Sequence, residues 1–133
     1  MAATPGLHAA NLADAWLGTL KNVTTGLPFA ACWVKLHVGN PGTDGLQNVA
    51  TETDRKQITW GTISAGALPI SGTLSWTPWD SGPETITHMS VWTASTAGNY
   101  LYSFAITSKA LANGDTLNLT AHTISLTPIA STA

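Results

Sequence analysis

The chain has unusually few charged side chains. Only 9% of its 133 residues are Asp, Glu, Lys or Arg, compared with about 25% in ordinary soluble domains. Most of its surface must therefore be neutral, and a net charge of −2 favours association with other chains. The five Lys and Arg residues cannot neutralise a row of phosphates, so we expect no binding to nucleic acid.

Cysteine and long apolar runs are scarce as well. The single Cys32 excludes an internal disulfide and a zinc site built from cysteines, and we expect it to be a buried apolar residue. No uninterrupted apolar run approaches the roughly 18 residues of a membrane span. The N-terminus lacks the basic and apolar segments of a signal peptide. We therefore expect no signal peptide and no membrane partner.

Motifs for catalysis and for cofactor binding are missing too. The sequence contains no GxSxG nucleophile elbow, no GxxxxGK[ST] phosphate loop and no HExxH or His-x-His pair for a metal. The nearest carboxylate pairs, Glu84 with Asp80 and Glu52 with Asp54, lie in turn-like segments, where solvated acids are the expected state. We therefore expect no catalytic residue, no cofactor and no metal.

One helical segment stands at the start of the chain. Leu12, Trp16 and Leu20 recur at the spacing of one helical face, and a preceding Thr-Pro pair is typical of a helix start. We predict a helix near residues 5–20. Its apolar face should pack on the rest of the domain or on a neighbouring subunit.

The remainder of the chain predicts β-structure. Apolar and polar residues alternate in short runs between residues 30 and 128, separated by glycine and proline. Connections this short leave no room for crossover helices, so the sheets should be mainly antiparallel. Pro69 and Gly72 split one run, and a kink is expected near residues 121–123. We predict one mainly β domain over residues 1–133, an antiparallel β-sandwich of jelly-roll or Ig-like type with about six to eight strands and one N-terminal α-helix.

A glycine-rich loop, LHVGNPGTDGLQN, follows the first of these runs. Pro41 can fix φ and Gly42 can supply a positive φ, while Asn40 can bond the backbone across the reversal. Alternatively, calcium could be held by oxygen ligands from Asp44, Asn48, Glu52 and Asp54, although the DxDxDG spacing is absent. We expect a turn, and we expect the loop from Gly39 to Thr53, with Asp44 near its middle, to reach a neighbouring subunit.

Tryptophan is abundant, with six residues in the chain. Trp60 and Trp92 alternate with polar residues in predicted strands, so we assign both to the core. Trp76 and Trp79 flank Thr-Pro in SWTPWDSGPE. Exposed aromatic residues in such a turn would be typical of interface anchors or of sugar-stacking platforms. Alternatively, both rings cover one end of the core.

Four features occur in a fixed order along nearly the whole chain. The amphipathic helix is followed by VKLHVGNPG, then ITHMSVWTASTAGNYLYS, then ANGDTLNLTAHTISL. This order resembles a family of small virion proteins of tailed bacteriophages, labelled tail fibre, head decoration or capsid cement proteins. One departure is Thr93, where the family usually has Asp.

The resemblance implies a structural role in the virion. Low charge, and the absence of coiled-coil heptads or repeated shaft motifs, favour a capsid decoration or cement protein bound to the major capsid protein or other virion proteins. The alternative is a tail fibre or tail-tip module that contacts the host surface and binds carbohydrate. We also expect a homo-oligomer, with a trimer as first choice, assembled in the host cytoplasm. The predicted interface residues are Leu12, Trp16, Leu20, Asn40, Pro41, Asp44, Trp76 and Trp79.

Overall fold

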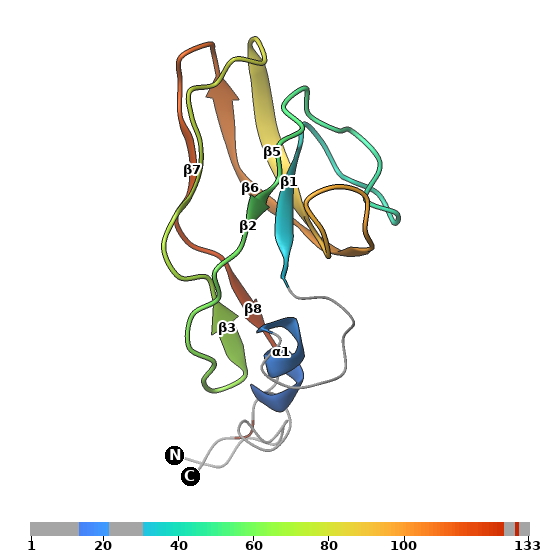
Figure 1. Ribbon diagram of the computed structural model, residues 1–133, viewed down its shortest axis with the longest axis vertical. Coiled ribbons are helices and arrows are strands. Elements are labelled where there is room, and N and C mark those ends of the chain that lie inside the picture. The colour runs from blue at the N-terminus through green and yellow to red at the C-terminus, as the bar shows by residue number, and fades with distance from the viewer. Residues whose placement is uncertain (1–13, 22–30, 127–129, 131–133) are drawn as a thin grey trace. The chain divides into compact units, whose positions relative to one another are not determined.

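The structure is a computed structural model that describes residues 14–21, 31–126 and 130 (Figure 1). These residues form one helix, α1 (Asp14–Lys21), and eight strands. Every strand pair is antiparallel. The prediction of a mainly β protein with antiparallel sheets is therefore confirmed. The first part of the predicted helix lies outside the described residues, so a helix over residues 5–20 stays a prediction.

The chain divides into two compact units. Unit 1 comprises residues 1–30, 59–72 and 120–133, and unit 2 comprises residues 31–58 and 73–119. Each unit is built from segments that are distant in sequence. The prediction of one domain for the whole chain stays a prediction.

Unit 2 contains a four-stranded sheet in the order β2-β1-β5-β6. Its strands are β1 (Trp33–His37), β2 (Lys56–Gln57), β5 (Glu84–Trp92) and β6 (Tyr100–Leu111). Val34 and Leu36 of β1 lie opposite Val91 and Met89 of β5, and all four side chains are buried. Alternate residues of a strand point to opposite faces, so this face of the sheet packs against the core of unit 2.

A two-stranded sheet in unit 2 contains Trp76, one of the two tryptophans that the sequence suggested as anchors, and Trp79 follows its first strand. It pairs β4 (Leu74–Trp76) with β7 (Leu117–Leu119). Trp76 and Trp79 are only 2% and 1% exposed, so the expectation of two exposed rings is wrong, and the alternative, that both rings cover the core, holds.

Hydrogen bonds explain why these two rings can be buried. The Trp76 Nε1–H donates to the Asp54 carbonyl at 2.8 Å, and the Trp79 Nε1–H donates to the Gly82 carbonyl at 2.9 Å. A buried indole is stable when its single polar group has such a partner. Because both N–H groups have acceptors, burying the apolar rings lowers the free energy of the folded protein relative to leaving them in water.

Unit 1 pairs β3 (Ala67–Pro69) with β8 (Thr123–Ser125). The Asp14 carboxylate, in the first turn of α1, accepts a 2.7 Å hydrogen bond from the Gly66 N–H. Gly66 has a φ of +73°, which favours glycine at this turn. The run split by Pro69 and Gly72 does form two short strands, β3 and β4, and the chain is interrupted between β7 and β8, as the expected kink requires.

Candidate functional site

The candidate site is the loop of residues 38–49, which follows β1 in unit 2. The Asn40 side chain accepts the Gly42 N–H at 2.9 Å, and the Asp44 side chain accepts the Leu46 N–H at 2.9 Å. Gly42 has a φ of +77°, so the expected reversal at Pro41 is present. Each short polar side chain closes a local turn on its own backbone, which gives the loop a defined shape.

Cross-links hold the two ends of this loop together. The Val38 N–H donates to the Asn48 carbonyl at 2.9 Å, and the Asn48 side-chain amide donates to the Asn40 carbonyl at 2.9 Å. Within the described residues, no group of three or more His, Cys, Asp or Glu side chains is arranged to hold a metal. The observed bonds therefore assign the loop carboxylate of Asp44 a role in turn formation.

A buried chain of polar side chains fixes the loop to the sheet. His37 Nε2 lies 2.7 Å from Ser90 Oγ, and the Trp92 Nε1–H donates to the same hydroxyl oxygen at 2.7 Å. On the other side of the ring, His37 Nδ1 lies 2.9 Å from the Gln47 carbonyl oxygen. His37 and Ser90 are both 0% exposed. The loop is thus bonded to a residue in the interior of unit 2.

The direction of these hydrogen bonds fixes the protonation state of His37. Because the Gln47 carbonyl can only accept, Nδ1 carries the hydrogen, and Nε2 of the neutral ring accepts from the Ser90 hydroxyl. Burial lowers the pKa of His37 from its usual 6.5, although the hydrogen bond to the Gln47 carbonyl acts in the opposite direction. A protonated ring would leave the buried Ser90 hydroxyl without its acceptor. The network therefore requires neutral His37.

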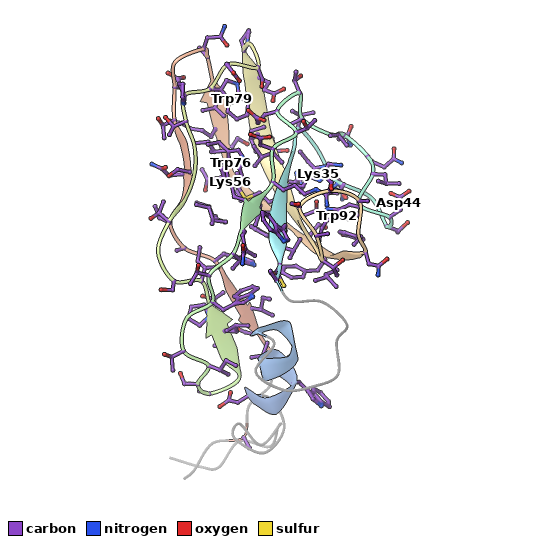
Figure 2. All side chains as sticks on the ribbon, viewed as in Figure 1. Lys35, Asp44, Lys56, Trp76, Trp79 and Trp92 are labelled. Carbon is purple, nitrogen blue, oxygen red and sulfur yellow. The ribbon has the colours of Figure 1, made fainter. Side chains whose placement is uncertain are left out.

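Two cationic side chains lie at the Trp92 ring. The Arg55 guanidinium carbon is 4.5 Å from the ring centroid, and the Lys35 Nζ is 5.4 Å from it; Figure 2 shows Lys35 beside Trp92. Tyr100 packs against the same ring with centroids 5.5 Å apart. Both cations fall within the roughly 6 Å range of a cation–π interaction.

The loop also exposes apolar side chains. Leu46 is 57% exposed, Val38 is 40% exposed and Val49 is 37% exposed. Three such residues in one hydrogen-bonded loop make a surface that is suited to a protein contact. None of the three was predicted as an interface residue, although an apolar residue among Gly, Asp and Asn in LHVGNPGTDGLQN was a visible signal.

The other predicted interface residues differ in how exposed they are. Asn40 and Asp44 are exposed, whereas Pro41 is fully buried, so its expected role as a contact residue is wrong. Trp16 is 55% exposed on α1. Leu12 and the side chain of Leu20 lie outside what the structure describes, so both assignments stay predictions.

An antiparallel β protein with a low-charge surface and an ordered, partly apolar loop fits the class of virion structural proteins that the sequence motifs resemble. A family model described as "Podophage GP4 fiber I protein gp80" matches residues 8–127. The chain belongs to this family of podophage fibre proteins. The match confirms a phage virion protein and supports the tail-fibre alternative rather than capsid decoration. No curated protein matches the chain.

The described part of the chain contains no helix with the length and apolar character needed to cross a bilayer.

Proposed function

We propose that this chain is a non-enzymatic structural subunit of a podophage tail fibre, and that copies of it associate through unit 1. Assembly into the virion takes place in the host cytoplasm, and a closed trimer is the simplest arrangement. The proposal of a fibre subunit is supported by the family to which the chain belongs. The proposal of self-association is supported by the surface of unit 1. In this proposal other virion proteins contact the loop of residues 38–49.

The observation that carries self-association is the distribution of charge. The chain has five Lys and Arg and seven Asp and Glu residues, but only Asp14 and Lys21 fall within unit 1. The Asp14 carboxylate already accepts the Gly66 N–H. Two copies of such a surface meet with little like-charge repulsion and little cost for removing ions from water.

Unit 1 also leaves apolar surface uncovered. Of its described large apolar side chains, Leu17 and Leu68 are fully buried. Several others keep part of their surface exposed, namely Trp60, Ile63, Ile70, Ile124 and Leu126. With Trp16 at 55% exposure, this amounts to an apolar surface that a second copy can cover, at roughly 25 cal/mol for each Å² removed from water.

We also propose that the two sheets of unit 2 form the predicted sandwich. Buried side chains come from both sheets, including Val34 and Leu36 of β1 and Trp76 and Leu117 of the β4–β7 pair. Two sheets whose inner faces share one core are the defining feature of that architecture.

Trp16→Glu tests the self-association proposal. The substitution places a charge on the exposed apolar face, so sedimentation should show the wild-type oligomer converting to monomer. Leu46→Glu is the matched control, because it adds the same charge to an equally exposed site in unit 2 and should leave the oligomer intact. A wild-type protein that stays monomeric at high concentration would contradict the proposal.

Gold-labelled antibody against the chain tests its place in the virion. Label on tail fibres is the expected result. Label spread over the head shell would instead favour the capsid decoration protein.

A further inference from the structure

The geometry points to an oxyanion-binding site in unit 2, formed by Lys35 and Arg55 at the Trp92 ring, that takes a carboxylate or a phosphate group. The site does not depend on self-association through unit 1.

Arg55 is held with one edge free. Its Nη1 donates to the Ala94 carbonyl at 2.9 Å and to the Ala97 carbonyl at 2.8 Å, which uses both hydrogens on that nitrogen. No described residue accepts from Nη2 or Nε. These two nitrogens form the fork that binds carboxylate or phosphate oxygens in a bidentate manner. The guanidinium is therefore preorganised by two carbonyls, while its other two nitrogens have no acceptor among the described residues.

Lys35 supplies a second cation at the same Trp92 ring. Its ammonium group interacts with the Trp92 ring at 5.4 Å, and no carboxylate in the described part of the chain forms an ion pair with it or with Arg55. Glu52, which is close to Arg55 in sequence, directs its carboxylate to the Asp54 N–H at 2.9 Å and to the Ser81 hydroxyl at 3.4 Å. All three ammonium hydrogens of Lys35 thus lack a described acceptor.

The energetic cost of this arrangement suggests a ligand. Both side chains are partly buried, and two like charges at one ring repel each other. Burial lowers the pKa of Lys35, and the charge of Arg55 lowers it further; burial also lowers the pKa of Arg55. A bound anion would compensate for both charges at once.

The ligand is recognised by its charge and not by stacking. Trp92 is only 5% exposed, so its ring cannot serve as a platform for a sugar or a base. The anionic group could belong to an acidic sugar or to a phosphate-bearing polymer. Both would offer two equivalent oxygens to the Arg55 fork and the Lys35 ammonium.

Titration of the full chain with glucuronate, and separately with glycerol phosphate, tests the site. The NMR signals of Arg55 Nε–H and Trp92 Nε1–H should shift and saturate, with a Kd on the order of 1 mM. Lys35→Met should weaken binding about tenfold, the equivalent of one lost charge-assisted hydrogen bond. Arg55→Lys should weaken it similarly, because a lysine lacks the fork. Lys109→Ala, an exposed lysine on β6, should leave binding unchanged.

The unfolding midpoint of Lys35→Met separates a binding role from a structural one. The variant keeps the apolar stem and removes a partly buried, repelled charge, so it should be as stable as the wild type or more stable. If only glucuronate or only glycerol phosphate saturates the two NMR signals, that result identifies the bound group as a carboxylate or as a phosphate. The site is refuted if neither probe shifts the two signals, if Lys109→Ala weakens binding as much as Lys35→Met, or if Lys35→Met destabilises the fold and binds as well as the wild type.

Discussion

The Ser90 hydroxyl forms hydrogen bonds with two ring nitrogens, one from His37 and one from Trp92. It accepts from the Trp92 Nε1–H and donates to His37 Nε2, each at 2.7 Å. Ser90→Ala would leave a buried donor and a buried acceptor unsatisfied at the same time. Because each such group costs on the order of 1–3 kcal/mol, we expect a loss of at least about 2 kcal/mol in urea unfolding.

Ser75→Ala is the control for this prediction. The Ser75 hydroxyl also donates to a side chain, Oδ1 of Asn118 at 2.6 Å, but both residues are exposed. Water can replace that bond, so the change should stay within about 0.5 kcal/mol. Equal effects of the two substitutions would show that burial of the network contributes nothing.

Protonation of histidine should make the protein less stable in acid. Burial lowers the native-state pKa of His37 and of His122 below 6.5. Between that lowered pKa and about 6.5, the unfolded chain binds more protons than the native chain, so falling pH favours unfolding. The stabilisation is fully present above about pH 6.5 and is lost below it.

Urea unfolding from about pH 7.5 to about pH 5 measures this effect. His37→Gln and His122→Gln should each flatten the decline, because each removes one group whose pKa differs between the two states. If the free energy of unfolding falls with pH as steeply in both variants as in the wild type, groups other than these two histidines cause the loss.

At the scale of elements, the loop of residues 38–49 depends on a glycine for its close approach to the sheet. Gly45 has a φ of +72°, and a Cβ there would lie 2.6 Å from Tyr100 Cδ1 and 2.9 Å from Trp92 Cζ2. Gly45→Ala therefore combines backbone strain with a clash against two rings. We expect it to cost more than about 2 kcal/mol in unfolding free energy and to raise proteolysis within the loop.

Gly82→Ala isolates the backbone contribution. Gly82 has a φ of +79°, and a Cβ there would meet nothing within 4 Å. The cost should be about 1 kcal/mol, because only the left-handed conformation is penalised. If both alanine variants lose the same stability, contact with the rings is not what holds the loop.

Strands with a strict period of two were predictable from the sequence. β5 occupies Glu84–Trp92, close to the segment that alternation indicated, because Met89 and Val91 must face one side while Ser90 faces the other. The predicted strand around Trp60 was less well predicted. It yields only Lys56–Gln57 as a strand, because pairing with β1 ends there and the pattern of residues does not encode where a partner stops.

The burial of Trp76 and Trp79 could not be predicted from their local sequence. Thr, Pro, Asp and Gly around them are typical of an exposed turn. The Trp76 Nε1–H donates to the Asp54 carbonyl, which is distant in sequence. The Trp79 Nε1–H donates to the nearby Gly82 carbonyl, but the Trp79 backbone N–H donates to the distant Asp115 carbonyl at 2.8 Å. Long-range partners of this kind become visible only in the folded chain.

The residues of the oxyanion site could not be predicted from the sequence either, because they come together only in the folded chain. Lys35 and Arg55 are separated by the whole 38–49 loop in sequence, and the pairing of Val34 with Lys56 brings their strands together. Arg55 belongs to none of the quoted motifs, and Lys35 was quoted within VKLHVGNPG without being assigned a role. His37 lies in the same motif, but its partner Ser90 became identifiable only from the β1–β5 register, in which Lys35 lies opposite Ser90.

At the scale of the whole molecule, charge is divided unevenly between the two units. Unit 1 contributes one acid and one base, so the net charge of −2 belongs to unit 2. The two proposed interactions therefore differ in their physical basis. Association of unit 1 buries neutral and apolar surface, whereas the site at Lys35 and Arg55 attracts its ligand by charge.

Salt should separate these two interactions in one set of measurements. Raising sodium chloride shortens the screening length to about 3 Å at 1 M, so the apparent Kd for glucuronate or glycerol phosphate should rise several-fold. The oligomer seen in sedimentation should persist or strengthen, because its apolar contacts do not depend on charge, and sodium sulfate should favour it further. Trp16→Glu introduces a charge at the interface. It should therefore weaken association at every salt concentration. An oligomer that dissociates in high salt would mean that ion pairs hold the copies together, and the apolar surface of unit 1 would then not be the interface.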